Sequence, residues 1–250
     1  MSNFSVSWRA AKKCEQTWTQ AVHQLRRGDQ RSAAALFDTA VAHDPTAADA
    51  WLGLHAAGWR QAEAVQTMAR FSHTFGALRT KAGLPLSSRY NIGGYVTSRL
   101  ETARDLWLAT MAGLLFEGRL DDAGQFLSTA VPDCDETRFI LTRYAFLRND
   151  WPLVLEHSRG ITDGFLLDEA QLYTGIALWK QGVNHEALRV LGTVPQELGA
   201  ESGFAAEVAY FRGRALDDLD RADEALQQYQ FTYRLQPDFV DVAERAQART

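Results

Sequence analysis

The sequence predicts an all-α chain in which pairs of helices repeat, with one short β-hairpin inserted among them. Three observations support this prediction. Only six of the 250 residues are proline. The chain is rich in alanine, leucine, glutamate, glutamine and arginine, which favour helices. A small residue also recurs at regular intervals, where the second helix of each pair must approach the first closely. These small residues are Ala33, Ala64, Ala123, Val154, Ala187 and Ala225.

The spacing of the small residues predicts the number of repeats. Four of the five intervals are close to the ~34 residues of a tetratricopeptide repeat, a unit of two helices joined by a tight turn. The interval from Ala64 to Ala123 exceeds that unit by about 25 residues. The pattern therefore resembles a superhelix of about six tetratricopeptide-like repeats, with an insertion between the second and the third.

Other residues in each repeat agree with this assignment. A larger residue follows the small one after a helical turn and fills the space beyond it, as Phe37 follows Ala33. Glycines stand where first helices must end, because a helix C-cap often needs the left-handed conformation. Prolines stand where second helices must stop. The glycines are Gly28, Gly118 and Gly182, and the prolines are Pro45, Pro132, Pro195 and Pro237.

The insertion predicts a β-hairpin near residues 84–98. Helical periodicity fails between Gly83 and Thr102, and Pro85 is incompatible with a helix interior. Gly93-Gly94 resembles a tight turn between two short runs of aromatic and β-branched residues. An irregular loop is the alternative. The residues expected to form this finger are Tyr90, Ile92, Gly93, Gly94 and Tyr95.

We expect one elongated domain spanning residues 1–250, because repeats of this kind stack into a continuous solenoid that needs capping segments at its ends. The expected repeats are 14–47, 48–82, 104–133, 135–165, 166–197 and 204–238, with the finger at 83–103 and a capping helix at 239–249.

The sequence carries no catalytic signature, so we expect no enzymatic activity. It contains no phosphate loop, no H-E-x-x-H and no G-x-S-x-G. Its six histidines are scattered, and neither Cys14 nor Cys134 has a cysteine or histidine partner nearby. We therefore expect neither a metal site nor a cofactor. The formal charge of −5 argues against nonspecific binding to nucleic acid, which needs a basic surface.

The N-terminal segment and the longest apolar run predict where in the cell the protein is found. Residues 1–13 lack the apolar stretch of a signal peptide. The longest apolar run, Leu106 to Phe116, is too short to cross a bilayer as a helix. We expect a cytoplasmic protein without membrane insertion and with two reduced thiols.

In superhelices of this type, the first helix of each repeat lines an extended binding surface. Side chains of these helices that fall outside the packing face are candidates for contact with a partner. Basic groups beside aromatic rings suit an extended peptide, or a helix, with acidic residues. Solvated charges without a ligand are the alternative. The candidates are Arg26, Phe139, Arg143, Trp179, Lys180, Tyr210 and Arg214.

Several short blocks resemble the N-terminal domain of EccA, the cytosolic AAA+ ATPase of type VII (ESX) secretion systems. The resemblance implies six tetratricopeptide-like repeats with a β-finger. It also implies recognition of secreted substrates or other secretion components, and modulation of an attached ATPase ring. The blocks are Leu36-Phe37, Asp44-Pro45, Asp49-Ala50-Trp51-Leu52-Gly53, Phe75-Gly76 and Ile92-Gly93-Gly94-Tyr95.

The chain also departs from that family. The family has Gly-Asp soon after the Trp-Leu-Gly block, whereas here Gly58 precedes Trp59. No phosphate loop follows the repeats, so the ATPase activity of the family is not carried over. Two interpretations remain open: an interaction domain of an EccA-like ATPase, or a free-standing repeat scaffold in another cytoplasmic assembly.

Overall fold

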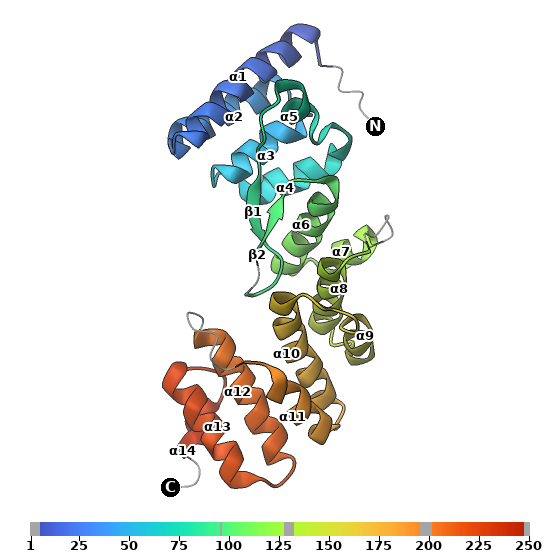
Figure 1. Cartoon of the computed structure of the whole chain (residues 1–250), viewed down its shortest axis with the longest axis vertical. Helices are drawn as coiled ribbons and strands as arrows, with labels where there is room; N and C mark the ends of the chain where they lie inside the picture. The colour runs from blue at the N-terminus through green and yellow to red at the C-terminus, as the bar shows by residue number, and fades with distance from the viewer. Residues whose placement is uncertain (1–5, 96, 128–132, 196–201, 248–250) are drawn as a thin grey trace. The chain divides into compact units, whose positions relative to one another are not determined.

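A computed structural model of the chain describes residues 6–95, 97–127, 133–195 and 202–247. Within these ranges it contains fourteen α-helices, one short 3-10 helix and one antiparallel sheet of two strands (Figure 1). The all-α, tetratricopeptide-like fold with a small β-hairpin is thereby confirmed. The chain forms two compact units, one of residues 1–92 and 97–131 and the other of residues 93–96 and 132–250. The expectation of a single domain stays a prediction.

The first unit holds three helix pairs and the strands of the hairpin. The pairs are α1 (Trp8–Arg26) with α2 (Gln30–His43), α3 (Ala48–Ala56) with α4 (Gln61–Arg70), and α6 (Ala103–Phe116) with α7 (Leu120–Phe126). Between α4 and α6 lie η1 (Ser72–Thr74), α5 (Ala77–Ala82), β1 (Ser88–Asn91) and β2 (Thr97–Leu100). The sequence pattern did not predict η1 or α5 as separate elements.

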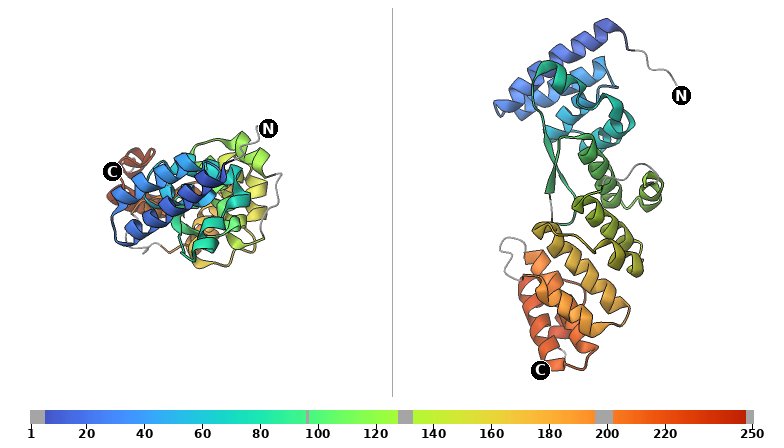
Figure 2. Two further views of the ribbon diagram at one scale, coloured as in Figure 1. Left: turned by 90° about the horizontal axis from the view of Figure 1, so that it is seen from above. Right: turned by 45° about the vertical axis from the view of Figure 1, so that its right-hand side comes forward.

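The second unit holds three more helix pairs and a terminal helix. The pairs are α8 (Asp135–Leu147) with α9 (Trp151–His157), α10 (Gly164–Lys180) with α11 (Asn184–Thr193), and α12 (Ser202–Asp217) with α13 (Ala222–Leu235). The last helix is α14 (Val242–Gln247). In both units the members of a pair lie side by side, as the views of α1 with α2 and of α12 with α13 show (Figure 2).

The spacing of small residues is explained by the packing inside each helix pair. All six of them have a relative exposure of 0%. Two first helices carry a glycine opposite the large residue of their own second helix. A Cβ atom at Gly175 would lie 2.4 Å from Leu191, and one at Gly213 would lie 2.6 Å from Tyr229. A third glycine, Gly53 of α3, faces the preceding pair, where its Cβ atom would lie 2.2 Å from the ring of Phe37 in α2. Glycine therefore allows close packing within the pairs α10–α11 and α12–α13, and between α2 and α3.

Helix ends follow the signals in the sequence. Gly28, Gly118 and Gly182 have φ values of +84°, +69° and +75°, so the predicted left-handed C-caps are confirmed. Ser7 caps α1 by accepting from the N–H of Ala10. Thr102 opens α6, where its side chain and that of Asp105 form a capping box. Pro132 lies outside the described residues.

The hairpin differs from its prediction in the position of the turn. Arg89 pairs with Arg99 and Asn91 pairs with Thr97 in antiparallel register. The strands therefore end before the glycines, and Gly93-Gly94 is not a two-residue turn between them. Tyr95 lies outside the ladder, and its N–H donates to the carboxylate of Glu169.

The C-terminal capping helix is shorter than predicted. It begins at Val242 rather than at Phe239, because Val240 has a left-handed φ of 48° that interrupts a helix. Residues 248–249 of the predicted helix lie outside the described residues. Phe239 instead packs its ring against Tyr210, with 5.2 Å between the ring centroids.

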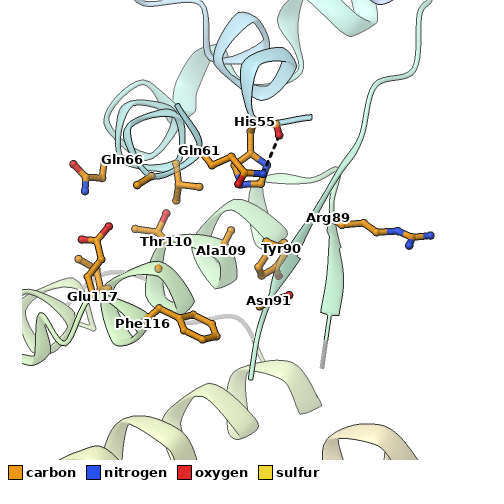
Figure 3. A pocket seen from close by; sticks show the side chains of 14 residues that line it. His55, Gln61, Gln66, Arg89, Tyr90, Asn91, Ala109, Thr110, Phe116 and Glu117 are labelled. Carbon is orange, nitrogen blue, oxygen red and sulfur yellow. Dashed lines mark hydrogen bonds between the residues drawn. The ribbon is translucent and has the colours of Figure 1, made fainter. Parts of the chain in front are cut away.

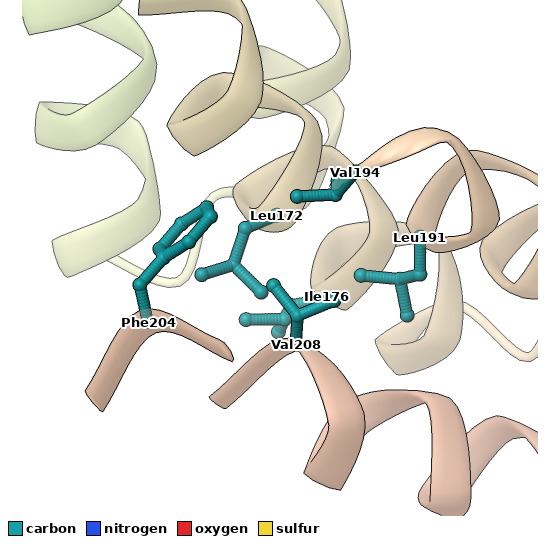
Figure 4. Packing of buried hydrophobic residues seen from close by; sticks show 6 residues of the cluster. All are labelled: Leu172, Ile176, Leu191, Val194, Phe204 and Val208. Atoms are coloured by element: carbon teal, nitrogen blue, oxygen red, sulfur yellow. The ribbon is translucent and has the colours of Figure 1, made fainter. Parts of the chain in front are cut away.

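One hydrophobic cluster of the second unit lies between its last two helix pairs. Leu172 and Ile176 of α10 meet Leu191 of α11 and Val194 at the end of that helix, and Phe204 and Val208 of α12 close the cluster (Figure 4). All six are buried. Tyr95 and Trp179 pack against this cluster and are only partly buried, so each presents part of its ring at the surface.

A buried carboxylate organises the first unit. Asp49, with a relative exposure of 0%, accepts from the N–H groups of Gly76 and Leu78 at 2.9 and 2.8 Å. These bonds place its charge at the N-terminus of α5, where the helix dipole stabilises an anion. Trp18 donates its indole N–H to the carbonyl of Asp49 at 3.0 Å. The Asp49–Gly53 block and the Phe75-Gly76 block thus meet in the structure.

Candidate functional site

The tip of the hairpin, residues 93–95, contacts the first helices of the second unit. Gly94 donates its N–H to Glu169 Oε1 at 2.8 Å. Tyr95 donates its N–H to Glu169 Oε2 at 3.1 Å. One carboxylate on α10 therefore binds two successive backbone N–H groups. The hydroxyl of Tyr173 donates to the same carboxylate at 2.5 Å.

The side chain of Tyr95 lies on α12. Its ring meets Phe204 edge to face, with 4.9 Å between the centroids. Its hydroxyl donates to Glu207 Oε2 at 3.2 Å. Glu169, Tyr173, Phe204 and Glu207, with Phe139 below Gly93, form what we call the tip site.

Burial shapes the protonation of the tip site. Burial raises the pKa of Glu207, and the nearby charge of Glu169 adds to the effect, while the bond from Tyr95 opposes it. Burial also raises the pKa of Tyr173 well above its usual range, and the carboxylate of Glu169 acts in the same direction. Tyr173 is therefore protonated at neutral pH and donates its hydroxyl proton to Glu169.

A second group of side chains lies at the C-terminal end of α10 and the adjoining part of α12. The indole of Trp179 is flanked by Lys180 Nζ at 4.6 Å and by Arg214 Cζ at 4.7 Å, each measured to a ring centroid. The indole N–H donates to Asp218 Oδ2 at 2.8 Å. Arg214 donates to the hydroxyl of Tyr210 at 3.2 Å. We call Trp179, Lys180 and Arg214 the indole cluster.

The indole cluster reaches the surface. Lys180 is exposed, while Trp179 and Arg214 are half-buried. In the part of the chain that the structure describes, neither cation lies within salt-bridge distance of a carboxylate, although the charge of Arg214 helps to lower the pKa of Asp241. The cluster therefore places two positive charges beside one aromatic ring.

The structure brings together four of the seven partner-binding candidates and separates the other three. Trp179, Lys180, Tyr210 and Arg214 lie together, although Tyr210 is 2% exposed and offers little surface. Arg26 belongs to the first unit, where it donates to the carbonyl of Pro85 at 2.9 Å.

Phe139 and Arg143 do not lie on an open face as the sequence suggested. Their relative exposures are 0% and 8%. Phe139 packs against Tyr173, with 6.2 Å between the ring centroids, and its ring lies within 2.7 Å of where a Cβ atom of Gly93 would stand. The tip thus lies over part of the face that the sequence had suggested for a partner.

The finger residues take different positions. Tyr90 and Ile92 are buried in the first unit. Gly93 is buried, Gly94 is exposed and Tyr95 is half-buried. The role of the finger residues as a group stays a prediction, but the contacts above give Gly93, Gly94 and Tyr95 a defined place.

Apart from Phe139, sequence reasoning did not find the residues that receive the tip. Glu169 has a relative exposure of 1%, yet it stands in a predominantly apolar helix, between Leu166 and Leu172 on the buried stripe. An acidic residue at such a position needs hydrogen-bond partners. That signal was available in the sequence, although it does not identify the partners.

A pocket of about 370 Å³ lies in the first unit between α4, β1 and α6 (Figure 3). Gln61 donates to the carbonyl of His55 at its edge at 3.3 Å. The imidazole of His55 bonds Ser88 Oγ at 2.7 Å, and burial lowers its pKa. Thr110, Phe116 and Glu117 of α6 line the same pocket. Its volume suits a small ligand group.

The described residues contain no cluster of three or more histidine, cysteine or acidic side chains that could hold a metal ion. None of the described helices is long and apolar enough to cross a membrane.

Comparison with known proteins identifies the family. A family model for the N-terminal domain of the type VII, ESX-1 secretion system protein EccA1 matches residues 11–248. The chain belongs to the EccA1 N-terminal domain family. The resemblance seen in the sequence blocks is therefore confirmed. No curated protein matches the chain.

A solved structure agrees with the fold of this EccA1-type domain. The crystal structure of the N-terminal domain of the EccA1 ATPase from the ESX-1 secretion system of Mycobacterium tuberculosis is 19% identical. It matches with a TM-score of 0.81 over 97% of this chain and 91% of that one. YrrB, a TPR protein with an unusual peptide-binding site, is 18% identical, with a TM-score of 0.32 over 93% of this chain and 90% of that one.

Proposed function

We propose that this EccA1-type domain is a non-catalytic protein-interaction domain that binds a protein segment carrying an acidic side chain at the indole cluster. One observation carries the proposal: the cations of Lys180 and Arg214 flank the half-buried ring of Trp179 and form no salt bridge with a described carboxylate. A carboxylate placed there would pair with both cations, and an aromatic neighbour in the same segment would extend the stack on the indole.

The family supports the choice of partner. Because the chain belongs to a family named for a secretion-system protein, we propose that its ligands are secreted proteins or other secretion components in the cytoplasm. We also propose that binding modulates an attached or associated AAA+ ATPase domain. The alternative is a free-standing scaffold in another cytoplasmic assembly. The reading frame beyond residue 250 separates the two, because a phosphate loop there favours the first and a stop codon the second.

Binding to the cognate ESX substrates and secretion components, measured by pull-down and then by calorimetry, tests the proposal. The variant is Lys180→Glu combined with Arg214→Glu, and we expect a loss of affinity of at least ~10-fold, since two attractive pairs become repulsive. The control is Arg189→Glu, an exposed arginine of α11 whose partner is Glu186, and its affinity should stay within about 2-fold of the wild type.

Each negative result has a separate meaning. If a substrate binds and the charge reversal at Lys180 and Arg214 leaves its affinity unchanged, the indole cluster is not the binding site. If no ESX substrate or secretion component binds the wild-type domain, the proposed partner class is wrong.

A further inference from the structure

We propose that the tip site is a recognition site for Gly-x-Tyr segments of partner proteins, occupied in this structure by the chain's own Gly93-Gly94-Tyr95. The tip is then a tethered internal ligand that a partner segment of the same chemistry displaces. This inference goes beyond the proposed function, because it uses none of the side chains of the indole cluster.

The carboxylate of Glu169 points to a ligand that offers backbone N–H groups. It is almost fully buried, and two of its three hydrogen bonds come from the tip. A buried carboxylate is stable only where donors satisfy it. Backbone N–H groups of an extended segment supply these donors whatever its side chains, so the carboxylate anchors the main chain of the ligand.

The space around the glycines defines the first two positions of the motif. A Cβ atom at Gly93 would lie 2.5 Å from Glu169 Oε2 and 2.7 Å from the ring of Phe139, so only glycine fits there. A Cβ atom at Gly94 would meet Glu169 Oε1 at 3.5 Å, which is ordinary van der Waals contact. The first position therefore requires glycine, and the second accepts a side chain.

The third position selects an aromatic residue with a hydroxyl group. Phe204 offers an edge-to-face contact to the ring, and Glu207 accepts a hydrogen bond from its hydroxyl. A phenylalanine would keep the ring contact but would leave the half-buried Glu207 without this donor. Tyrosine satisfies both groups, which gives the motif Gly-x-Tyr.

The tip lies partly at the surface. Gly94 is exposed and Tyr95 is half-buried, and both residues donate hydrogen bonds to carboxylates of α10 and α12. Its advantage over a free ligand is its tether, which provides an effective concentration on the order of millimolar. A partner that also contacts other surfaces of the domain can overcome that advantage.

A binding assay with a synthetic copy of the finger tests the proposal. The probe is a fluorescein-labelled peptide with the sequence of residues 89–98, and its anisotropy is measured against the full chain. In the Gly93→Ala variant the internal ligand no longer fits, so we expect the peptide to bind at least 10-fold more tightly than it binds the wild type. The matched control is Gly94→Ala, which should behave as the wild type.

Variant peptides test the two glycine positions in the ligand instead of in the chain. A peptide with alanine in place of its first glycine should lose binding to the Gly93→Ala chain, whereas alanine in place of the second should be tolerated. Glu169→Gln introduced into the Gly93→Ala chain should weaken binding by about 10-fold, because charge-assisted hydrogen bonds become neutral ones.

Circular dichroism shows whether each variant folds. If Gly93→Ala does not fold, Tyr95→Ala replaces it, because it empties the aromatic position without a clash. The proposal is overturned if the folded Gly93→Ala or Tyr95→Ala chain binds no peptide, or binds it no more tightly than the wild type does. It is overturned as well if the two alanine peptides bind equally. It is also overturned if neither variant folds, since the tip is then a structural element. None of these results bears on the indole cluster, because no secretion partner is used.

Discussion

The carboxylate of Asp49 and the guanidinium of Arg79 form a 2.7 Å ion pair, in which the Asp49 side chain has a relative exposure of 0%. Arg79 also donates to the carbonyls of Leu86 and Glu101 at 3.2 and 2.7 Å, and its guanidinium lies 4.4 Å from the ring centroid of Phe75. This pair therefore joins the second helix pair to both flanks of the hairpin in the first unit.

Asp49→Ala should lower the free energy of unfolding by about 3 kcal/mol, because removing one partner of a buried pair leaves the other charge unsatisfied. The control is Asp38→Ala, which breaks an exposed ion pair with Arg60. This substitution should change the free energy of unfolding by less than about 1 kcal/mol. Urea unfolding monitored by circular dichroism measures both. Equal effects of the two substitutions would show that the network around Asp49 does not stabilise the unit.

Two glycine-to-alanine substitutions in the first unit should have opposite signs. Gly53→Ala places a methyl group against the ring of Phe37, and we expect it to destabilise by about 1–3 kcal/mol through overpacking. Gly113→Ala in α6 meets nothing within 4 Å, and it should stabilise by about 0.5–1 kcal/mol, because alanine favours helix more than glycine does.

Thermal unfolding distinguishes the two glycine substitutions. A double-mutant cycle with Phe37→Leu then assigns the loss at Gly53 to this contact, since the smaller side chain should recover part of the stability. If the Gly53→Ala chain were as stable as the wild type, the conclusion that α2 and α3 pack closely at Phe37 would be wrong.

His55 should give the domain a measurable dependence on mildly acidic pH. Burial lowers the pKa of its imidazole in the folded state, so below the unfolded value of about 6.5 the unfolded chain binds more protons. Its contribution to stability is therefore complete above that value and is lost as the pH falls through the folded pKa. His55→Gln should reduce the loss of stability between pH 7.5 and 5.5, measured by urea unfolding.

The control for this dependence is His23→Gln, which changes an exposed histidine of α1 and should leave the pH dependence of the wild type intact. A His55→Gln chain that loses as much stability as the wild type over the same pH interval would rule out the buried imidazole as its source.

Cys14 should resist chemical modification in the folded chain. It has a relative exposure of 1%, and burial raises the pKa of its thiol to about 12. Iodoacetamide at pH 8 should therefore label the half-buried Cys134 first, and should label Cys14 only after unfolding. Peptide mass analysis reads the two sites separately, and Cys134→Ala should give a folded chain that takes up almost no label.

The same thiol predicts how stability changes at alkaline pH. Because the folded pKa of Cys14 exceeds the unfolded value of about 8.5, the folded state retains a proton that the unfolded state releases. Stability from this source is complete below about pH 8.5 and declines above it. Cys14→Ala should flatten that decline in urea unfolding at pH 8 and pH 10.

The parts of the fold that were predictable from the sequence are those determined by neighbouring residues. A small residue followed one helical turn later by a large residue indicates close packing between the two helices of a pair. Glycine at the end of a first helix reports a left-handed cap, as Gly118 does. Each of these signals depends on a few residues that are close in the sequence. The signals recur in six repeats, so the repeats could be aligned with one another.

The position of the finger tip could not be predicted in this way. Gly94 and Glu169, which form its principal bond, are separated by 75 residues, and no periodicity connects them. The exposure of Phe139 was also misjudged. Its ring packs against Tyr173 and lies against Gly93 of the tip, and neither contact can be read from the local sequence.

The tip site also constrains the order in which the protein can fold. Most contacts of a repeat solenoid join neighbouring repeats and can form as soon as each pair leaves the ribosome. Tyr95, by contrast, bonds Glu207, a residue 112 positions later, so this contact must wait until α12 has been synthesised. Closing so long a loop is slow compared with forming helix pairs. Seating of the tip should therefore be a late step of folding, detectable as slow protection of the Tyr95 N–H in pulsed hydrogen-exchange refolding experiments.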